Sequence, residues 1–167
     1  MGAWSWKFVL ERLHAAGHDA RALPFRGVGE RAAELSPALD NDVFLADTLA
    51  ALEKDDLRDV VLVGHSFGSL IIDDPELAAW THRQLTPHPV ACYTKPIRLH
   101  HPAGNGRPIT YIACTKPRYP VSAGMHEKVQ TMPHIRFRPI EAGHNCIISA
   151  PNLVADELLR IPQWASN

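Results

Sequence analysis

The feature that most constrains this fold is a short aliphatic run followed at once by a serine between glycines. Residues 60–63 read Val-Val-Leu-Val, and residues 64–68 read Gly-His-Ser-Phe-Gly. A short, continuous, β-branched run is typical of a strand buried on both faces of a parallel sheet. The two glycines permit a sharp strand-to-helix turn that side chains would obstruct. We therefore expect a buried strand over 60–63, a tight turn, and a helix that begins at Ser66.

The rest of the chain alternates between helical and strand-like segments. Apolar residues recur at intervals of three and four in the predicted helices, and proline or glycine stands at several of their ends. This alternation indicates an α/β fold with a mostly parallel sheet of about four strands covered by helices. Residues 1–167 are expected to form one domain, since no repeat or linker divides them. We predict helices over 6–16, 42–52, 66–72, 75–85, 121–130 and 151–161, and strands over 19–25, 60–63, 108–114 and 135–140.

Charge and composition exclude several classes of protein. The chain has 167 residues and a formal charge of −1, with 46 % hydrophobic and 21 % charged residues, as is ordinary for a soluble globular domain. We expect no nucleic-acid or membrane partner, because there is no basic surplus to attract phosphates and no apolar run long enough for a span. The three cysteines are scattered and no leader-like segment is visible, so a cytoplasmic location is expected.

Histidine is frequent, but its spacing does not indicate a metal site. None of the ten histidines has zinc-type spacing, and no Cys-x-x-Cys occurs. His100 and His101 stand together in a segment rich in proline and glycine, where no carboxylate or cysteine completes a ligand set. A metal-binding protein is therefore the least supported class, and we expect no cofactor.

Ser66 and His144 are the residues predicted to carry chemistry. A serine hydroxyl is a weak nucleophile at neutral pH and needs a base within hydrogen-bond reach. The turn at residues 64–68 would present Ser66 at a helix N-terminus. His144 lies in the loop just beyond the last predicted strand, where a partner base is expected. His65, inside the turn, is expected to be structural.

No carboxylate is clearly placed to orient His144. The loop after the predicted 108–114 strand contains no acidic residue. Glu127 lies within a predicted helix, and Glu141 precedes the histidine too closely to orient it easily. Asp73 and Asp74 are better explained as a turn or a helix cap. The third member of a catalytic triad therefore has no clear candidate.

Several blocks of the sequence, taken in order, resemble one family. They are residues 2–18, 27–37, 56–66, 85–89, 96–99, 110–115 and 143–144. With them the chain looks like the bacterial α/β-hydrolases, esterase-like proteins related to plant methylesterases and hydroxynitrile lyases. The resemblance implies a serine esterase or lyase fold without metal or organic cofactor. It implies Ser66 as nucleophile, His144 as general base and the backbone N–H of Phe67 as an oxyanion donor.

The sequence departs from that family in two places. The family's first strand and its His-Gly loop, which supplies the second oxyanion donor, would precede Gly2. A strand, a carboxylate-bearing loop and most of a lid would follow residues 71–72. The resemblance thus implies a chain that is N-terminally truncated and internally shortened, with an incomplete α/β-hydrolase fold and the lid largely missing. Loss of one oxyanion donor costs about 2.7–4 kcal/mol in the transition state.

We therefore expect a serine hydrolase that acts on small carboxylic esters through a Ser-His acyl-enzyme, with impaired activity. Two alternatives stay open. In one, the shortened chain repacks or forms a homodimer that restores the sheet and full activity. In the other, it is a catalytically inactive α/β-hydrolase remnant that acts as a binding protein.

Overall fold

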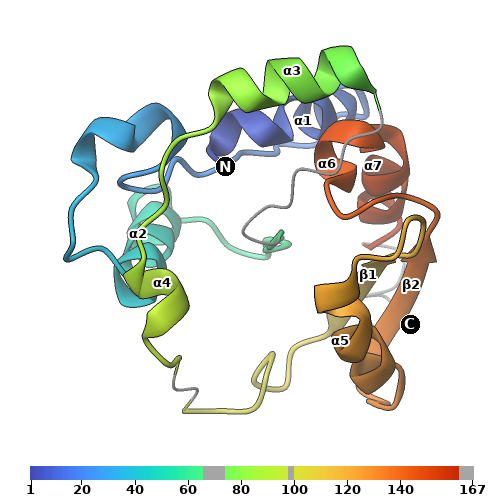
Figure 1. Ribbon diagram of the computed structural model, residues 1–167. Helices are drawn as coiled ribbons and strands as arrows, with labels where there is room; N and C mark the ends of the chain where they lie inside the picture. Colours follow the sequence, from blue (N-terminus) through green and yellow to red (C-terminus); the bar gives the residue numbers. More distant parts are fainter. Residues whose placement is uncertain (66–73, 98–99, 162–167) are drawn as a thin grey trace.

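The structure, a computed structural model, describes residues 1–65, 74–97 and 100–161 (Figure 1). The predicted helices at 6–16, 42–52, 75–85, 121–130 and 151–161 are confirmed to within a few residues, whereas the helix predicted to begin at Ser66 lies outside the described residues. The short elements η1, η2, α4 and α6 were not predicted. In chain order the elements are η1 (Ala3–Trp6), α1 (Lys7–Ala15), η2 (Gly29–Glu34), α2 (Asn41–Lys54), α3 (Pro75–Gln84), α4 (Ala91–Thr94), β1 (Ile109–Cys114), α5 (Pro120–Gln130), β2 (Ile135–Ile140), α6 (Cys146–Ser149) and α7 (Pro151–Leu159).

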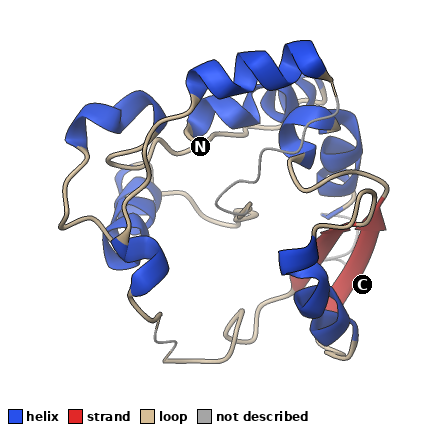
Figure 2. Ribbon diagram, in the orientation of Figure 1, coloured by secondary structure: helices blue, strands red, loops and turns tan. Residues whose placement is uncertain are grey.

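Strands β1 and β2 form a parallel pair, as the sequence predicts. Their register runs from Ile109 opposite Ile135 to Cys114 opposite Ile140. Helix α5 connects them, because parallel strands need a crossover rather than a hairpin. Figure 2 shows the two strands side by side at one end of a mostly helical structure. Since both strands run the same way, the loops after Cys114 and Ile140 leave the same edge of the sheet.

The strand predicted over 60–63 is wrong. In the described part of the chain the sheet consists of β1 and β2 instead of about four strands. A strand forms when its N–H and C=O groups meet those of a neighbour, and no described segment pairs with 60–63. The segment is instead a loop in contact with solvent, and its residues are 47 % (Val60), 52 % (Val61), 69 % (Leu62) and 40 % (Val63) exposed.

The strand predicted over 19–25 is also wrong. Arg21 forms ion pairs with Asp19 at 2.9 Å and with Asp55 at 2.8 Å, and the second pair joins this stretch to the end of α2. Pro24 has no N–H to give to a ladder. Ion pairs and a missing donor therefore leave the segment as a loop.

The main core lies where α1, α6 and α7 meet the carboxyl ends of the two strands. Helix α3 covers α1 (Figure 1), with the rings of Phe8 and Trp80 5.7 Å apart. The buried side chains of this core are Val9, Cys114, Ile140, Ala142, Cys146, Ile147, Ile148, Val154 and Ala155.

The N-terminal segment is fastened to η2 through a close approach of two glycine backbones. The Glu30 carboxylate accepts hydrogen bonds from the backbone N–H groups of Ala3 at 3.0 Å and Trp4 at 2.6 Å. A Cβ placed on Gly29 would lie 2.4 Å from the Cα of Gly2. Gly29 also has a φ of +54°, in the left-handed region that favours glycine. Both positions therefore need a residue without a side chain.

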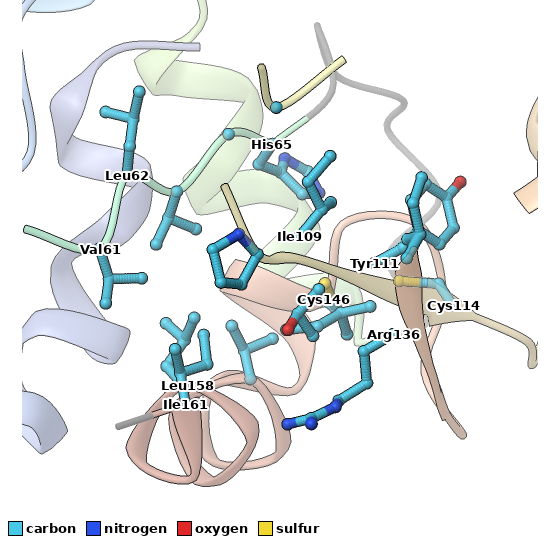
Figure 3. A pocket seen from close by; sticks show the side chains of 18 of the residues that line it. Val61, Leu62, His65, Ile109, Tyr111, Cys114, Arg136, Cys146, Leu158 and Ile161 are labelled. Atoms are coloured by element: carbon cyan, nitrogen blue, oxygen red, sulfur yellow. The ribbon is translucent and has the colours of Figure 1, made fainter. Parts of the chain in front are cut away.

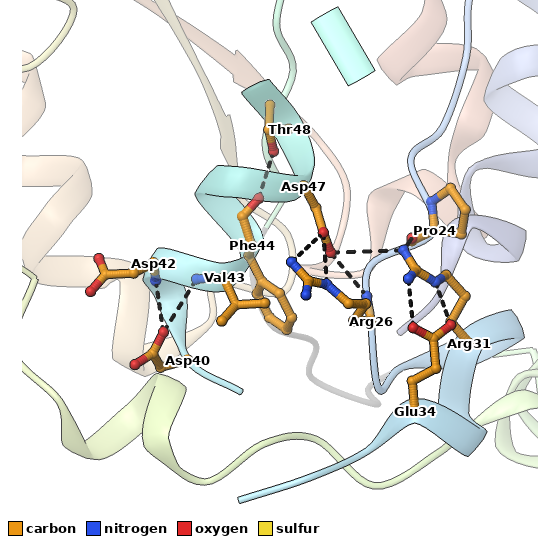
Figure 4. Close-up of polar contacts among 10 residues, drawn as sticks. All are labelled: Pro24, Arg26, Arg31, Glu34, Asp40, Asp42, Val43, Phe44, Asp47 and Thr48. Carbon is orange, nitrogen blue, oxygen red and sulfur yellow. Dashed lines mark hydrogen bonds and ion pairs between the residues drawn. The ribbon is translucent and has the colours of Figure 1, made fainter. Parts of the chain in front are cut away.

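Polar side chains fix the start of α2 and the loop that precedes it (Figure 4). The Asp40 carboxylate accepts from the backbone N–H groups of Asp42 at 3.1 Å and Val43 at 3.2 Å, so Asp40 is the N-cap. Further along α2, Asp47 binds Arg26 at 2.7 Å and Arg31 at 3.8 Å. These contacts hold the loop against α2.

Candidate active site

The candidate site lies at the edge of the sheet where β1 and β2 both end. The backbone N–H of Thr115 donates to the carbonyl of Ile140 at 3.0 Å, and that of Lys116 donates to the carbonyl of Ala142 at 3.2 Å. The loop after β1 is thereby tied to the loop that carries His144. Sites in parallel α/β sheets form at this carboxyl edge.

His144 is partly buried among aromatic rings. Its ring lies 4.6 Å from that of Tyr119 and 5.5 Å from that of His65, measured between centroids. The Nε2 atom is buried and has no hydrogen-bond partner among the described residues. Burial, with His126 as the second cause, lowers the pKa of His144 below its usual range. The ring is therefore neutral at pH 7 and can accept a proton.

His65 is joined to the main chain of His144. The Nε2–H of His65 donates to the carbonyl oxygen of His144 at 2.7 Å, across 79 residues of sequence. Burial lowers the pKa of His65, and this hydrogen bond offsets part of the effect. Residue 65, the immediate sequence neighbour of Ser66, thus lies against the His144 loop.

Ser66 and Phe67 lie outside the described residues, as does Asp73. The other carboxylates considered from sequence are occupied elsewhere. Glu141 is exposed and pairs with Lys116 at 3.6 Å. Glu127 pairs with Arg118 at 2.9 Å. Within the described ranges no carboxylate hydrogen-bonds or ion-pairs with the ring of His144.

A cavity of about 1240 Å³ opens between the 60–65 segment and β1. Figure 3 shows Val61 and Leu62 on one wall, Ile109 and Tyr111 on another, and Leu158 and Ile161 beyond them. His65, Tyr119 and His144 also line this cavity. It therefore offers a mostly apolar chamber whose wall carries four imidazoles, those of His65, His126, His134 and His144.

Three neighbours of the site were not expected from the sequence. Tyr119 stands in the loop after β1, and its position after a strand was its only signal. His126 reaches the site from α5 and contacts Tyr111 at 5.7 Å between centroids. Asn145 is fully buried, and neither its Oδ1 nor its Nδ2 has a partner in the described part of the chain. Nothing in the spacing of His126 or Asn145 distinguishes them before folding.

The described residues show neither a metal cluster nor a membrane-spanning helix. No group of three or more histidine, cysteine or carboxylate side chains lies together in a way that could hold a metal ion within residues 1–65, 74–97 and 100–161. His100 and His101 are both exposed. No described helix is long and apolar enough to cross a membrane.

Comparisons with known proteins find sequence similarity in the N-terminal half of the chain. A model of the α/β hydrolase family matches residues 1–78. A carbendazim hydrolyzing esterase from Nocardioides sp. (strain SG-4G) is 34 % identical over 71 residues, which are 42 % of this chain and 29 % of that enzyme. The match thus spans less than a third of the curated relative's length.

The fold itself matches a solved plant enzyme. The crystal structure of the methylesterase MES16 from Arabidopsis superposes with a TM-score of 0.76 at 20 % sequence identity, covering 98 % of this chain and 94 % of that one. The overall fold of this chain is therefore similar to that of a plant methylesterase. Residues 1–78 are thus similar to the α/β hydrolase family, and the chain has the fold of a solved methylesterase.

Proposed function

We propose that the protein is a serine hydrolase of small carboxylic esters, with Ser66 as nucleophile, His144 as general base and the backbone N–H of Phe67 as an oxyanion donor. The observation that carries the proposal is the 2.7 Å hydrogen bond between His65 and the carbonyl of His144, because it brings the sequence neighbour of Ser66 to the base. The lowered pKa of His144 adds to it, since only a neutral imidazole can take the proton of a serine.

The proposed reaction proceeds in two acyl transfers. Ser66 Oγ bonds to the carbonyl carbon while His144 Nε2 takes its proton, and His144 then returns that proton to the departing alcohol. Water attacks the acyl-enzyme, gives its proton to His144 and releases the acid, after which His144 reprotonates Ser66. The aliphatic cavity beside His144 would hold the apolar part of the ester.

We further propose that turnover is slow. A catalytic histidine is normally held in the correct tautomer by a carboxylate, and disabling that partner lowers kcat by about 10⁴-fold. Glu141 and Glu127, the two glutamates weighed as partners of His144, are paired with Lys116 and Arg118 instead. Residual acyl transfer would then depend on the pair Ser66 and His144 alone.

A fluorophosphonate probe and p-nitrophenyl acetate test the proposal. We expect labelling and slow hydrolysis by the wild type, and neither by Ser66→Ala or His144→Gln. Ser36→Ala and the exposed His82→Gln are matched controls that should retain both. Labelling that persists in Ser66→Ala would refute the assignment of the nucleophile.

A non-catalytic binding protein is the second candidate, and the lack of a carboxylate paired with the ring of His144 among the described residues favours it. In that case the wild type would resist the probe yet bind an apolar dye. Leu62→Glu, which places a charge in the aliphatic wall, would abolish such binding. Labelling of Ser66 by the probe would exclude this candidate.

We also propose a homodimer in a reducing, cytoplasmic setting. The 60–63 residues are 40–69 % exposed, so each chain offers an apolar surface to a second copy. Among the described strands β1 pairs only with β2, so each chain also offers a strand edge. Light scattering should give a dimer for wild type and for Leu45→Lys, which changes an exposed leucine on α2, and a monomer for Val61→Lys. Cys92, Cys114 and Cys146 are free and buried, as a reducing compartment permits.

A further inference from the structure

The ring of His65 is built into the wall between the 60–65 segment and the His144 loop. It contacts Trp6 edge-on, with centroids 6.2 Å apart, and lies 5.5 Å from the ring of His144. Its Nε2–H donates to the carbonyl of His144 at 2.7 Å. The His65 side chain therefore contacts the main chain of the proposed base, and His65 itself belongs to the segment that leads into Ser66.

This contact fixes the protonation of His65. A carbonyl oxygen can only accept, so the proton of the neutral ring lies on Nε2. The Nδ1 atom is buried without a partner among the described residues, so a second proton there would find no acceptor in them. His65 is thus held as a neutral donor and does not compete with His144 for a proton.

We propose that His65 is a positioning residue, which anchors the His144 loop to the segment carrying the nucleophile through its Nε2–H. This inference rests on the proposed hydrolase function for its catalytic consequence, but the anchoring itself is a property of the fold. The other ties of the loop act at its two ends. Ala142 receives the N–H of Lys116, and the carbonyl of Asn145 receives the N–H groups of Ile148 and Ser149. His65 holds the residue between them.

The test uses two amides that differ by one methylene. His65→Gln can place an N–H near the position of Nε2, whereas His65→Asn places its amide near Nδ1, too short to reach the carbonyl of His144. Both variants are polar and uncharged, so burial and charge are matched. His88→Asn, at a part-buried histidine whose ring contacts the carbonyl of Pro89 at 3.3 Å, controls for loss of a buried imidazole elsewhere.

Amide hydrogen exchange measures the anchoring without reference to catalysis. In His65→Asn we expect the Ile148 and Ser149 amides to exchange about three- to tenfold faster, the span that one hydrogen bond is worth. His65→Gln should restore the wild-type rates, and His88→Asn should leave them unchanged. Equal rates in His65→Asn and His65→Gln would overturn the proposal, even if the chain proves inactive as an esterase.

Kinetics measures the catalytic consequence. We expect His65→Asn to lower kcat for p-nitrophenyl acetate about 10- to 100-fold with little change in KM, because misplacement of a base costs this much. His65→Gln should recover most of the loss. If the wild type hydrolyses the ester and Gln and Asn are equally slow, the hydrolase function stands and the role of His65 is refuted.

Discussion

The contact between Gly2 and Gly29 joins two sequence blocks that both resemble the α/β hydrolases, and it can be tested by adding one methyl group. Gly29→Ala would place a Cβ 2.4 Å from the Cα of Gly2, where neither backbone can yield without moving η1 or η2. Gly17→Ala is the matched control. Gly17 also has a positive φ, of +85°, but an added Cβ there has no neighbour within 4 Å.

The expected magnitudes follow from these two geometries. An L-residue in the left-handed region costs about 1–2 kcal/mol, and this applies to both positions. Overpacking against a fixed neighbour adds about 1–3 kcal/mol, and this applies to Gly29 alone. We therefore expect the free energy of unfolding to fall by about 2–5 kcal/mol for Gly29→Ala and by about 1–2 kcal/mol for Gly17→Ala.

Urea denaturation followed by circular dichroism measures both variants. The denaturation slope should match the wild type, so that the midpoints report stability. A larger loss at Gly29 also predicts weakening of the Glu30 clamp, seen as faster exchange of the Ala3 and Trp4 amides. Equal losses in the two variants would show that the close approach adds nothing and would refute the reasoning.

Three further predictions concern the rest of the fold. Lowering the pH from 7.5 to 5 should reduce the Tm measured by calorimetry, because burial lowers the pKa of four histidines in the folded chain (His65, His88, His126 and His144). The unfolded chain therefore binds their protons first as the pH falls, so this stability is present above about pH 6.5 and is lost below it. A Tm that does not change with pH would contradict the prediction. Asn145→Leu should raise the free energy of unfolding by roughly 1–3 kcal/mol in urea, since it removes a buried amide without partners in the described residues, and a loss of stability would mean that the amide is satisfied. Asp74→Ala should cost about 1 kcal/mol in the same assay by uncapping α3, whereas Asp74→Asn keeps the cap and serves as control; equal losses would reject the capping role.

The helices could be predicted because their signals are local. Gly17 ends α1 with a left-handed φ, and Pro75, Pro120 and Pro151 stand in the first turns of their helices. Asp74, considered beforehand as a helix cap, accepts from the backbone N–H groups of Glu76 and Leu77 at 2.9 Å. Each of these interactions joins residues at most four positions apart, so the local sequence is enough to predict it.

The 60–63 strand could not be predicted correctly because strand formation is not local. Val, Val, Leu and Val have the composition of a buried strand, but composition does not supply a neighbour. Arg21 shows the same limit, since its ion pair with Asp55 crosses 34 residues. In both segments, contacts with distant parts of the chain determine whether a strand forms.

The loop that carries His144 could be predicted from the sequence, but the residues that contact it could not. His144 follows β2 as expected, because the end of a parallel strand is visible in the sequence. The partners of its ring and main chain, Tyr119, His126 and His65, come from three other segments. Their approach depends on how the loops pack, and no spacing rule encodes it.

The exposed 60–63 run also affects whether the protein aggregates at high concentration. An exposed, uncharged segment of high β-propensity is an aggregation hazard, and the 60–63 run could form the centre of one. Asp59, exposed and directly before the run, acts as a gatekeeper. In-register stacking of many chains would bring each Asp59 to within about 4.8 Å of its copies above and below, whereas an antiparallel pair keeps them apart. One acidic residue thus discourages fibres while leaving association of two chains permitted.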